Sequence, residues 1–110
     1  MTQIGQARTA LVRRILDGDG RASTLERKTA FNNNVLGGPM ALLVDKVARH
    51  AYRVTDEDIA AAKMSGLSED QVFEMVVCAA IGQATRQYDA ALMALEAAAG
   101  NAVMNAAGKE

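Results

Sequence analysis

The sequence predicts an all-α fold, and three observations support this prediction. The chain is half hydrophobic but only 4 % aromatic, so its core must be built from aliphatic residues and six Met. This composition suits closely packed helices better than sheets, which favour β-branched and aromatic residues. Apolar residues also recur at helical spacing along most of the chain. Finally, the stretch from Ser68 to Ala99 is long and apolar enough for the other elements to pack around it. We expect one compact helical domain over residues 1–110.

The first expected helix runs from Gln3 to Asp17. Its buried stripe consists of Ile4, Ala7, Leu11, Val12, Ile15 and Leu16. The Gly18-Asp19-Gly20 turn ends it. A second, shorter helix from Thr24 to about Asn32 is indicated by the capping-box spacing of Ser23 and Glu26, and the following asparagines break it.

The third expected helix begins near Pro39, which suits the first helical position because its missing N–H costs nothing there. Its buried stripe is Met40, Leu43, Val44, Val47 and Ala51, and it reaches about Tyr52. A fourth, short helix starts at Thr55, a capping residue followed by three carboxylates that the helix dipole favours, and Gly66 stops it. We expect this helix to form a helical hairpin with the central helix.

The central helix is apolar nearly all round, which indicates several packing neighbours. Ser68 and Gln71 form a capping box at its start, and Gly100 is expected to end it, leaving residues 101–110 as a frayed tail. Such a helix would be roughly 46 Å long, against a radius of gyration of about 13 Å for a compact chain of this size. We therefore expect it to bend near Gly82 or to extend into a partner subunit of a homo-oligomer.

Charge and targeting signals exclude several classes of function. The net charge of −1 and the sparse basic residues argue against nucleic-acid binding. The sequence MTQIGQARTA has no signal-peptide pattern, and no apolar run is long enough to span a membrane. We expect a cytoplasmic protein without membrane contact. Cys78 is the only cysteine, so an internal disulfide is impossible.

The segment from Asp58 through Leu95 has an Ala-rich short helix, the turn Ser65-Gly66-Leu67-Ser68-Glu69-Asp70 and a long apolar helix. This segment resembles the carboxymuconolactone decarboxylase and alkylhydroperoxidase D family. The resemblance implies an alkylhydroperoxidase D-like helical fold and a trimer or hexamer.

The peroxidase branch of that family carries C-x-x-C-x-x-x-H on the helix before this turn. Counting back from Gly66, the matching positions hold Ala51, Val54 and Asp58, so the redox motif is missing. Peroxidase chemistry needs one thiolate to attack and a second thiol to resolve the product, and Cys78 alone cannot supply both. A thiol peroxidase is therefore not expected, and Cys78 leaves only a third, weaker possibility of a thiol-dependent activity.

The decarboxylase branch lacks the thiol pair and works without a metal or redox cofactor, so the resemblance implies no cofactor here. It implies a lyase using acid–base chemistry on a small carboxylate or lactone. The missing motif equally supports an alternative: a non-catalytic oligomeric binding or scaffold protein that retains the fold.

Two residues are candidates for catalysis. Glu74 is the one charge within VFEMVVCAAI, and burying a lone carboxylate is costly unless it is paired or protonated. It is either a structural ion pair with an arginine or an acid–base group with a raised pKa. His50, the only histidine, lies at the edge of an apolar stripe and is either an ordinary surface residue or the partner of Glu74 at a pocket.

Four further residues are candidates for substrate binding. Arg53 or Arg86 could hold a carboxylate bidentately, although solvated arginines explain the same pattern. Cys78 and Tyr88 share the helix face of Glu74, where each is also consistent with ordinary packing. The acidic run Asp56-Glu57-Asp58 is accounted for by helix capping, so no metal site is expected.

Overall fold

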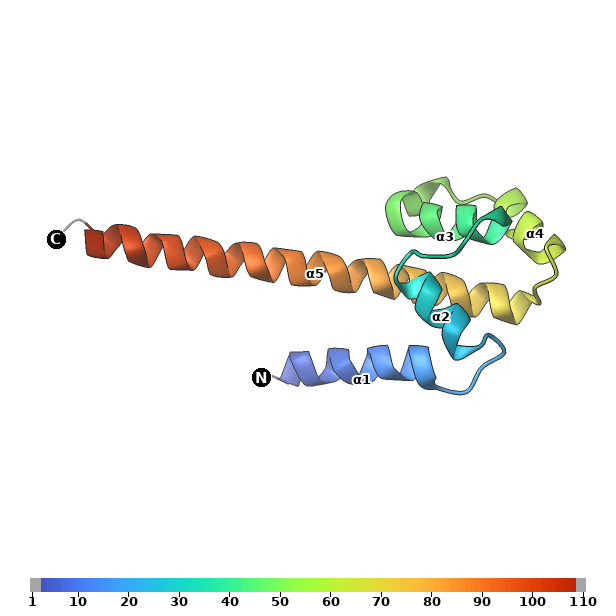
Figure 1. The fold of residues 1–110 in the computed structure, drawn as a ribbon, viewed down its shortest axis with the longest axis horizontal. Helices are drawn as coiled ribbons and strands as arrows, with labels where there is room; N and C mark the ends of the chain where they lie inside the picture. The colour runs from blue at the N-terminus through green and yellow to red at the C-terminus, as the bar shows by residue number, and fades with distance from the viewer. Residues whose placement is uncertain (1–2, 109–110) are drawn as a thin grey trace.

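The chain folds into helices with no strand among residues 3–108, the part of the backbone that the computed structural model describes; its side chains are described for residues 5–101 (Figure 1). The elements are α1 Gln3–Asp17, α2 Thr24–Phe31, α3 Gly38–His50, a 3-10 turn η1 Ala51–Arg53, α4 Asp56–Met64 and α5 Glu69–Gly108. The predicted all-α fold class is confirmed.

Reciprocal capping boxes fix the starts of α2, α4 and α5. In each box the hydroxyl of the cap accepts a backbone N–H three residues on, whose side chain in turn accepts the backbone N–H of the cap. The pairs are Ser23 with Glu26, Thr55 with Asp58, and Ser68 with Gln71. The sequence spacing therefore located these three helix starts correctly.

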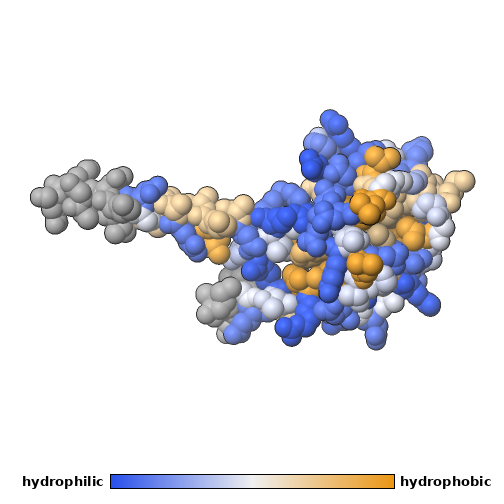
Figure 2. All heavy atoms as spheres, in the orientation of Figure 1, coloured by the Kyte–Doolittle hydropathy of each residue, from blue (hydrophilic) through white to orange (hydrophobic). Residues whose placement is uncertain are grey.

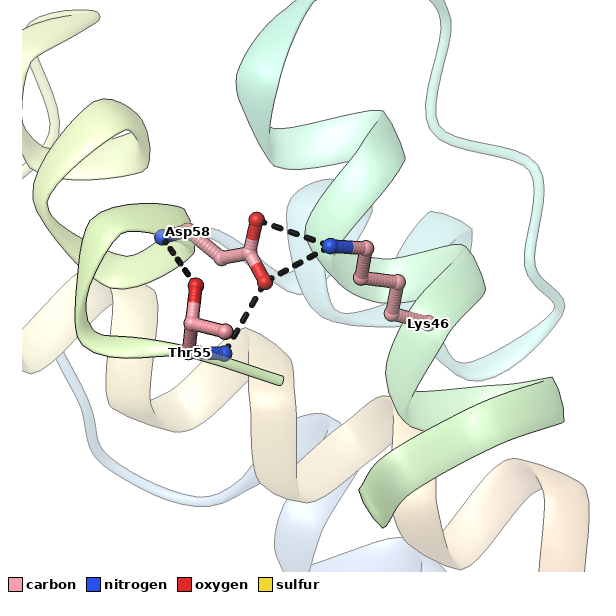
Figure 3. Close-up of polar contacts among 3 residues, drawn as sticks. All are labelled: Lys46, Thr55 and Asp58. Carbon is pink, nitrogen blue, oxygen red and sulfur yellow. Dashed lines mark hydrogen bonds and ion pairs between the residues drawn. The ribbon is translucent and has the colours of Figure 1, made fainter. Parts of the chain in front are cut away.

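The box at Thr55 also ties α4 to α3. Lys46 of α3 donates to both carboxylate oxygens of Asp58, at 3.0 and 2.9 Å, while Asp58 accepts the backbone N–H of Thr55 (Figure 3). The hydrogen bond from Lys46, and then the one from the Thr55 backbone, lower the pKa of Asp58 below its ordinary value. Asp58, the last residue of the acidic run, therefore has a structural role: it caps α4 and binds α3.

The core lies where α2, α3 and α4 pack against the first half of α5. Its buried hydrophobic residues are Ala22, Ala30, Met40, Leu43, Val44, Ala62, Val72, Met75, Cys78 and Ala79. Small residues on α5 let the neighbouring helices approach closely, as the Ala-rich composition predicted. The hairpin of α4 with α5 is a minor feature, because α4 contacts α3 more extensively than α5.

Two predicted helix ends need correction. α3 ends at His50 rather than Tyr52, because the chain tightens into the 3-10 turn Ala51–Arg53. α5 does not end at Gly100: it continues as one helix of 40 residues to Gly108. A single glycine costs only about 1 kcal/mol relative to alanine in a helix interior, and good helix formers surround this one. Residues 101–108, expected to fray, are helical, and residues 109–110 lie outside the described part.

Gly82 allows a close helix crossing instead of causing a bend. It is buried, and a Cβ built on it would collide with the carbonyl oxygen of Phe31 at the end of α2. Only a residue without a side chain lets α2 approach α5 so closely. Figure 1 shows α5 as a continuous rod without a sharp bend.

α1 runs antiparallel to α5 along the face on which Cys78 and Tyr88 were predicted to lie. The Cys78 thiol donates weakly to the carbonyl oxygen of Ile15 at 3.5 Å, and further along Arg8 binds Asp89 at 2.5 Å. Beyond the N-terminus of α1, α5 continues alone, away from the other helices (Figure 1). The molecule is accordingly elongated, 66 × 28 × 21 Å, with a radius of gyration of 18.2 Å.

Candidate functional site

The carboxylate of Glu74 holds the turn between α1 and α2. It accepts the backbone N–H of Arg21 on both oxygens, at 2.8 and 2.9 Å, and the N–H of Ala22 on Oε2 at 2.6 Å. The partners of Glu74 are thus backbone amides, and not the arginine side chain that the sequence suggested.

Gly20 makes this arrangement possible. A Cβ built on Gly20 would lie 2.6 Å from Oε1 of Glu74, closer than atoms can approach without displacement. The Gly18-Asp19-Gly20 turn, which the sequence marked only as the end of a helix, therefore wraps directly around the carboxylate.

The environment of Glu74 favours its ionised form. Burial acts to raise the pKa of Glu74, but the amides of Ala22 and Arg21, aided by the charges of Arg27 and Arg21, outweigh it and lower the pKa below 4.5. Of the two alternatives for Glu74, the acid–base group with a raised pKa is contradicted. At neutral pH Glu74 is therefore an ionised carboxylate that accepts backbone hydrogen bonds, and it is a weak base.

A groove of about 550 Å³ adjoins Glu74 between α1 and α5. Its lining combines apolar and charged side chains: Leu11, Arg14, Ile15, Gly18, Asp19, Arg27, Phe73, Glu74, Val77 and Cys78. Two arginines and two carboxylates oppose each other in this set. The groove therefore has no net preference for an anion, and His50 is not among its lining residues.

Arg27 is a buried cation that sequence reasoning missed. Only 7 % of the residue is exposed, and its Nη1 donates to the carbonyl oxygens of Gly18 at 2.6 Å and Ile15 at 3.3 Å. The C-terminal end of α1 is the negative end of its helix dipole, and it favours a cation in this place. Its Nε is buried without a hydrogen-bond partner. The sequence did indicate the burial of Arg27, because Arg27 lies at helical spacing from the apolar pair Ala30 and Phe31.

Cys78 lies in the wall of the groove but is buried, and this burial raises the pKa of its thiol above 9.0. A reactive cysteine needs an accessible thiolate. The structure instead places Cys78 as a small core residue beside Ile15.

His50 is the last residue of α3 and Arg53 the last residue of η1, and both lie on the surface. The His50 ring meets Tyr52 edge-on, with centroids 6.0 Å apart, and Arg53 stacks over Tyr52 at 5.6 Å. All three side chains are exposed. Neither His50 nor Arg53 lines the groove beside Glu74.

Tyr88 and Arg86 have separate surroundings. Arg8 lies over the Tyr88 ring at 5.2 Å, which is a cation–π contact between α1 and α5. Arg86 donates to the Phe31 carbonyl at 2.6 Å and to the Gln83 amide at 3.0 Å, where it lines a different, polar depression. Of the six predicted site residues, only Glu74 and Cys78 share a groove.

Among the described residues, no group of three or more His, Cys, Asp or Glu side chains could hold a metal ion. None of the described helices combines the length and apolar character needed to cross a membrane.

Comparison with protein-family models, curated proteins and solved structures finds no match to this chain. The resemblance to the carboxymuconolactone decarboxylase family thus remains a prediction from the residues alone.

Proposed function

We propose that this chain is a non-catalytic self-assembling protein whose end of α5 binds a second copy. We call residues 90–108 the projecting segment. Every described side chain in this segment, through Asn101, is exposed. Leu92, Met93 and Leu95 are 38, 68 and 67 % exposed. Figure 2 shows the described part of this segment as a mainly apolar stalk leaving the body.

The segment has little to stabilise it in isolation. At 1.5 Å per residue it projects by about 28 Å, and short isolated helices are marginal in water without packing against a partner. Glu96 is the only charged residue in the segment, so few charged groups keep this apolar surface in water. Burying each large apolar side chain would contribute about 1.5–3 kcal/mol. These features favour a partner that covers the segment.

The surface beside the segment suits a second copy of the same chain. Where α1 meets α5, a depression of about 430 Å³ is lined by the apolar residues Val12, Leu16 and Phe31. Its lining also contains two arginines, two aspartates and two threonines: Arg8, Arg13, Asp17, Asp89, Thr9 and Thr85. Arg13 is exposed and has no ion pair among the described residues. The leucines of the projecting segment complement the apolar part of this lining, and its one carboxylate, Glu96, complements Arg13.

Sedimentation of the full chain and two matched variants tests the proposal. Leu95→Glu places a charge in the projecting segment, whereas Leu36→Glu places the same charge at a 96 % exposed loop leucine. We expect the native chain and Leu36→Glu to assemble equally. Leu95→Glu should weaken assembly by about 10²–10⁴-fold, because a twofold interface loses two buried leucines. A chain that is monomeric at all concentrations, or equal assembly of both variants, would contradict the proposal.

A second candidate function is the acid–base enzyme acting on a small carboxylate or lactone. The groove beside Glu74 favours it, since binding sites are commonly clefts of a few hundred Å³. The lowered pKa of Glu74 and the position of His50 weigh against it. If small carboxylates or lactones are turned over, Glu74→Gln must abolish that turnover, and unchanged turnover would exclude Glu74 as the catalytic group.

A further inference from the structure

A second depression, unrelated to the Glu74 groove, lies where the end of α2 meets α3 and α5. It has a volume of about 510 Å³. Its lining is Asn32, Asn33, Asn34, Arg49, Gln83 and Arg86, and we call it the Asn–Arg pocket. The three consecutive asparagines that end α2 thus face two arginines from different helices.

Every side chain lining the Asn–Arg pocket can donate a hydrogen bond, and none is a carboxylate or an apolar residue. Pockets for drug-sized ligands are lined mainly by apolar side chains with a few polar groups, so this lining does not suit an apolar ligand. This composition instead resembles what a hydrated, negatively charged ligand requires.

Arg86, which lines the pocket, is held in place by two hydrogen bonds. Its Nη1 donates to the Phe31 carbonyl and its Nη2 to the Gln83 amide. Both hydrogen bonds restrict the guanidinium without neutralising it, because neither acceptor is charged. The guanidinium of Arg86 therefore keeps its full positive charge next to the pocket.

Arg49 is fixed from the other side by Asp45. Its Nε lies 2.9 Å from Asp45 Oδ1, which also accepts the Asn33 side-chain amide at 3.0 Å. Asn33 adopts the left-handed conformation, with φ of 55°, which asparagine tolerates better than most residues. Asp45 does not line the pocket, but its carboxylate orients Arg49 and Asn33 and offsets part of the charge of Arg49. Among the described residues, the terminal nitrogens of Arg49 have no hydrogen-bond partner.

We propose that the Asn–Arg pocket binds a small phosphomonoester. Two guanidinium groups and several amides offer more donors than the two oxygens of a carboxylate can accept, whereas a phosphate presents three terminal oxygens. The pocket is larger than a bare phosphate, so the remainder of the ligand lies beside Asn32 and Asn34. Amides both donate and accept, which suits hydroxyl groups on that remainder.

The experiment titrates the full chain with inorganic phosphate against chloride at matched ionic strength, following side-chain amide and guanidinium signals by NMR. The test variant is Arg49→Gln, because Arg86 also caps α2 and its loss could unfold the chain. The matched control is Arg53→Gln, which removes the same charge four residues away, outside the pocket.

We expect saturable shifts of the Asn32, Asn33 and Asn34 side-chain signals in the native chain and in Arg53→Gln. Arg49→Gln should bind phosphate about tenfold more weakly, the effect of losing one charge-assisted hydrogen bond. Glycerol 3-phosphate should bind more tightly than phosphate, and glycerol alone should not bind. Shifts spread over the surface, equal weakening in both variants, or no saturable response to phosphate would overturn the proposal.

Discussion

Glu74 and Gly20 form one structural unit although they are far apart in the sequence. The carboxylate of Glu74 occupies the space that any side chain at position 20 would fill, with Oε1 2.6 Å from an ideal Cβ. From there it receives the N–H groups of Arg21 and Ala22. This contact ties the turn between α1 and α2 to α5.

Gly20→Ala should therefore loosen the α1–α2 turn. The methyl group displaces a flexible carboxylate, which leaves backbone amides without their acceptor. We expect a loss of about 1–3 kcal/mol in the free energy of unfolding, measured by chemical denaturation. Combining it with Glu74→Gln should cost little more than either change alone, and additive losses would show that the two residues act separately.

The stability of the fold should depend on the ionisation of Glu74. The pKa of Glu74 in the folded chain lies below its ordinary value of 4.5, so the unfolded chain binds the proton more readily. The stabilisation by the carboxylate is complete above that ordinary value and is lost as the pH falls through the folded pKa. The native chain should exceed Glu74→Gln in stability at neutral pH, and the difference should shrink on acidification. A difference that is independent of pH would contradict this role.

Gly82 and Gly100 should respond to alanine in opposite directions. Helix propensity alone would stabilise α5 by up to about 1 kcal/mol at either position. At Gly100 nothing lies near an added Cβ, so Gly100→Ala should be stabilising and raise the helical signal in circular dichroism. At Gly82 the Cβ meets the Phe31 backbone, so Gly82→Ala should destabilise by about 1–3 kcal/mol. The same sign at both glycines would mean that α2 does not cross α5 there.

The Cys78 thiol should resist alkylation in the native protein. Its burial and raised pKa leave little accessible thiolate at neutral pH. Iodoacetamide should modify it only after denaturation, as mass spectrometry can follow. Rapid modification of the native chain would reopen a thiol-dependent activity.

Local signals in the sequence predicted local structure well. The capping residues Ser23, Thr55 and Ser68 specify helix starts because each box is completed within four residues. The composition likewise predicted the fold class. The helix end predicted at Gly100 was wrong. A glycine ends a helix only where the chain turns, and at Gly100 the backbone stays helical.

The candidate site was less predictable because its partners are distant in sequence. Glu74 was recognisable as a charge in an apolar run, but nothing local reveals that backbone amides of a turn 53 residues earlier satisfy it. The pairing of Glu74 with His50 rested on residue type, and His50 does not line the groove beside Glu74. Asn33, Asp45 and Arg49 meet only once α2 and α3 are packed together.

Amide hydrogen exchange of the projecting segment at increasing protein concentration tests the central claim of self-assembly most directly. If a second copy covers residues 90–108, their amides should become more protected as concentration rises, and Leu95→Glu should remove that increase. Amides that exchange at one fast rate at every concentration, in the native chain as in the variant, would contradict assembly through α5.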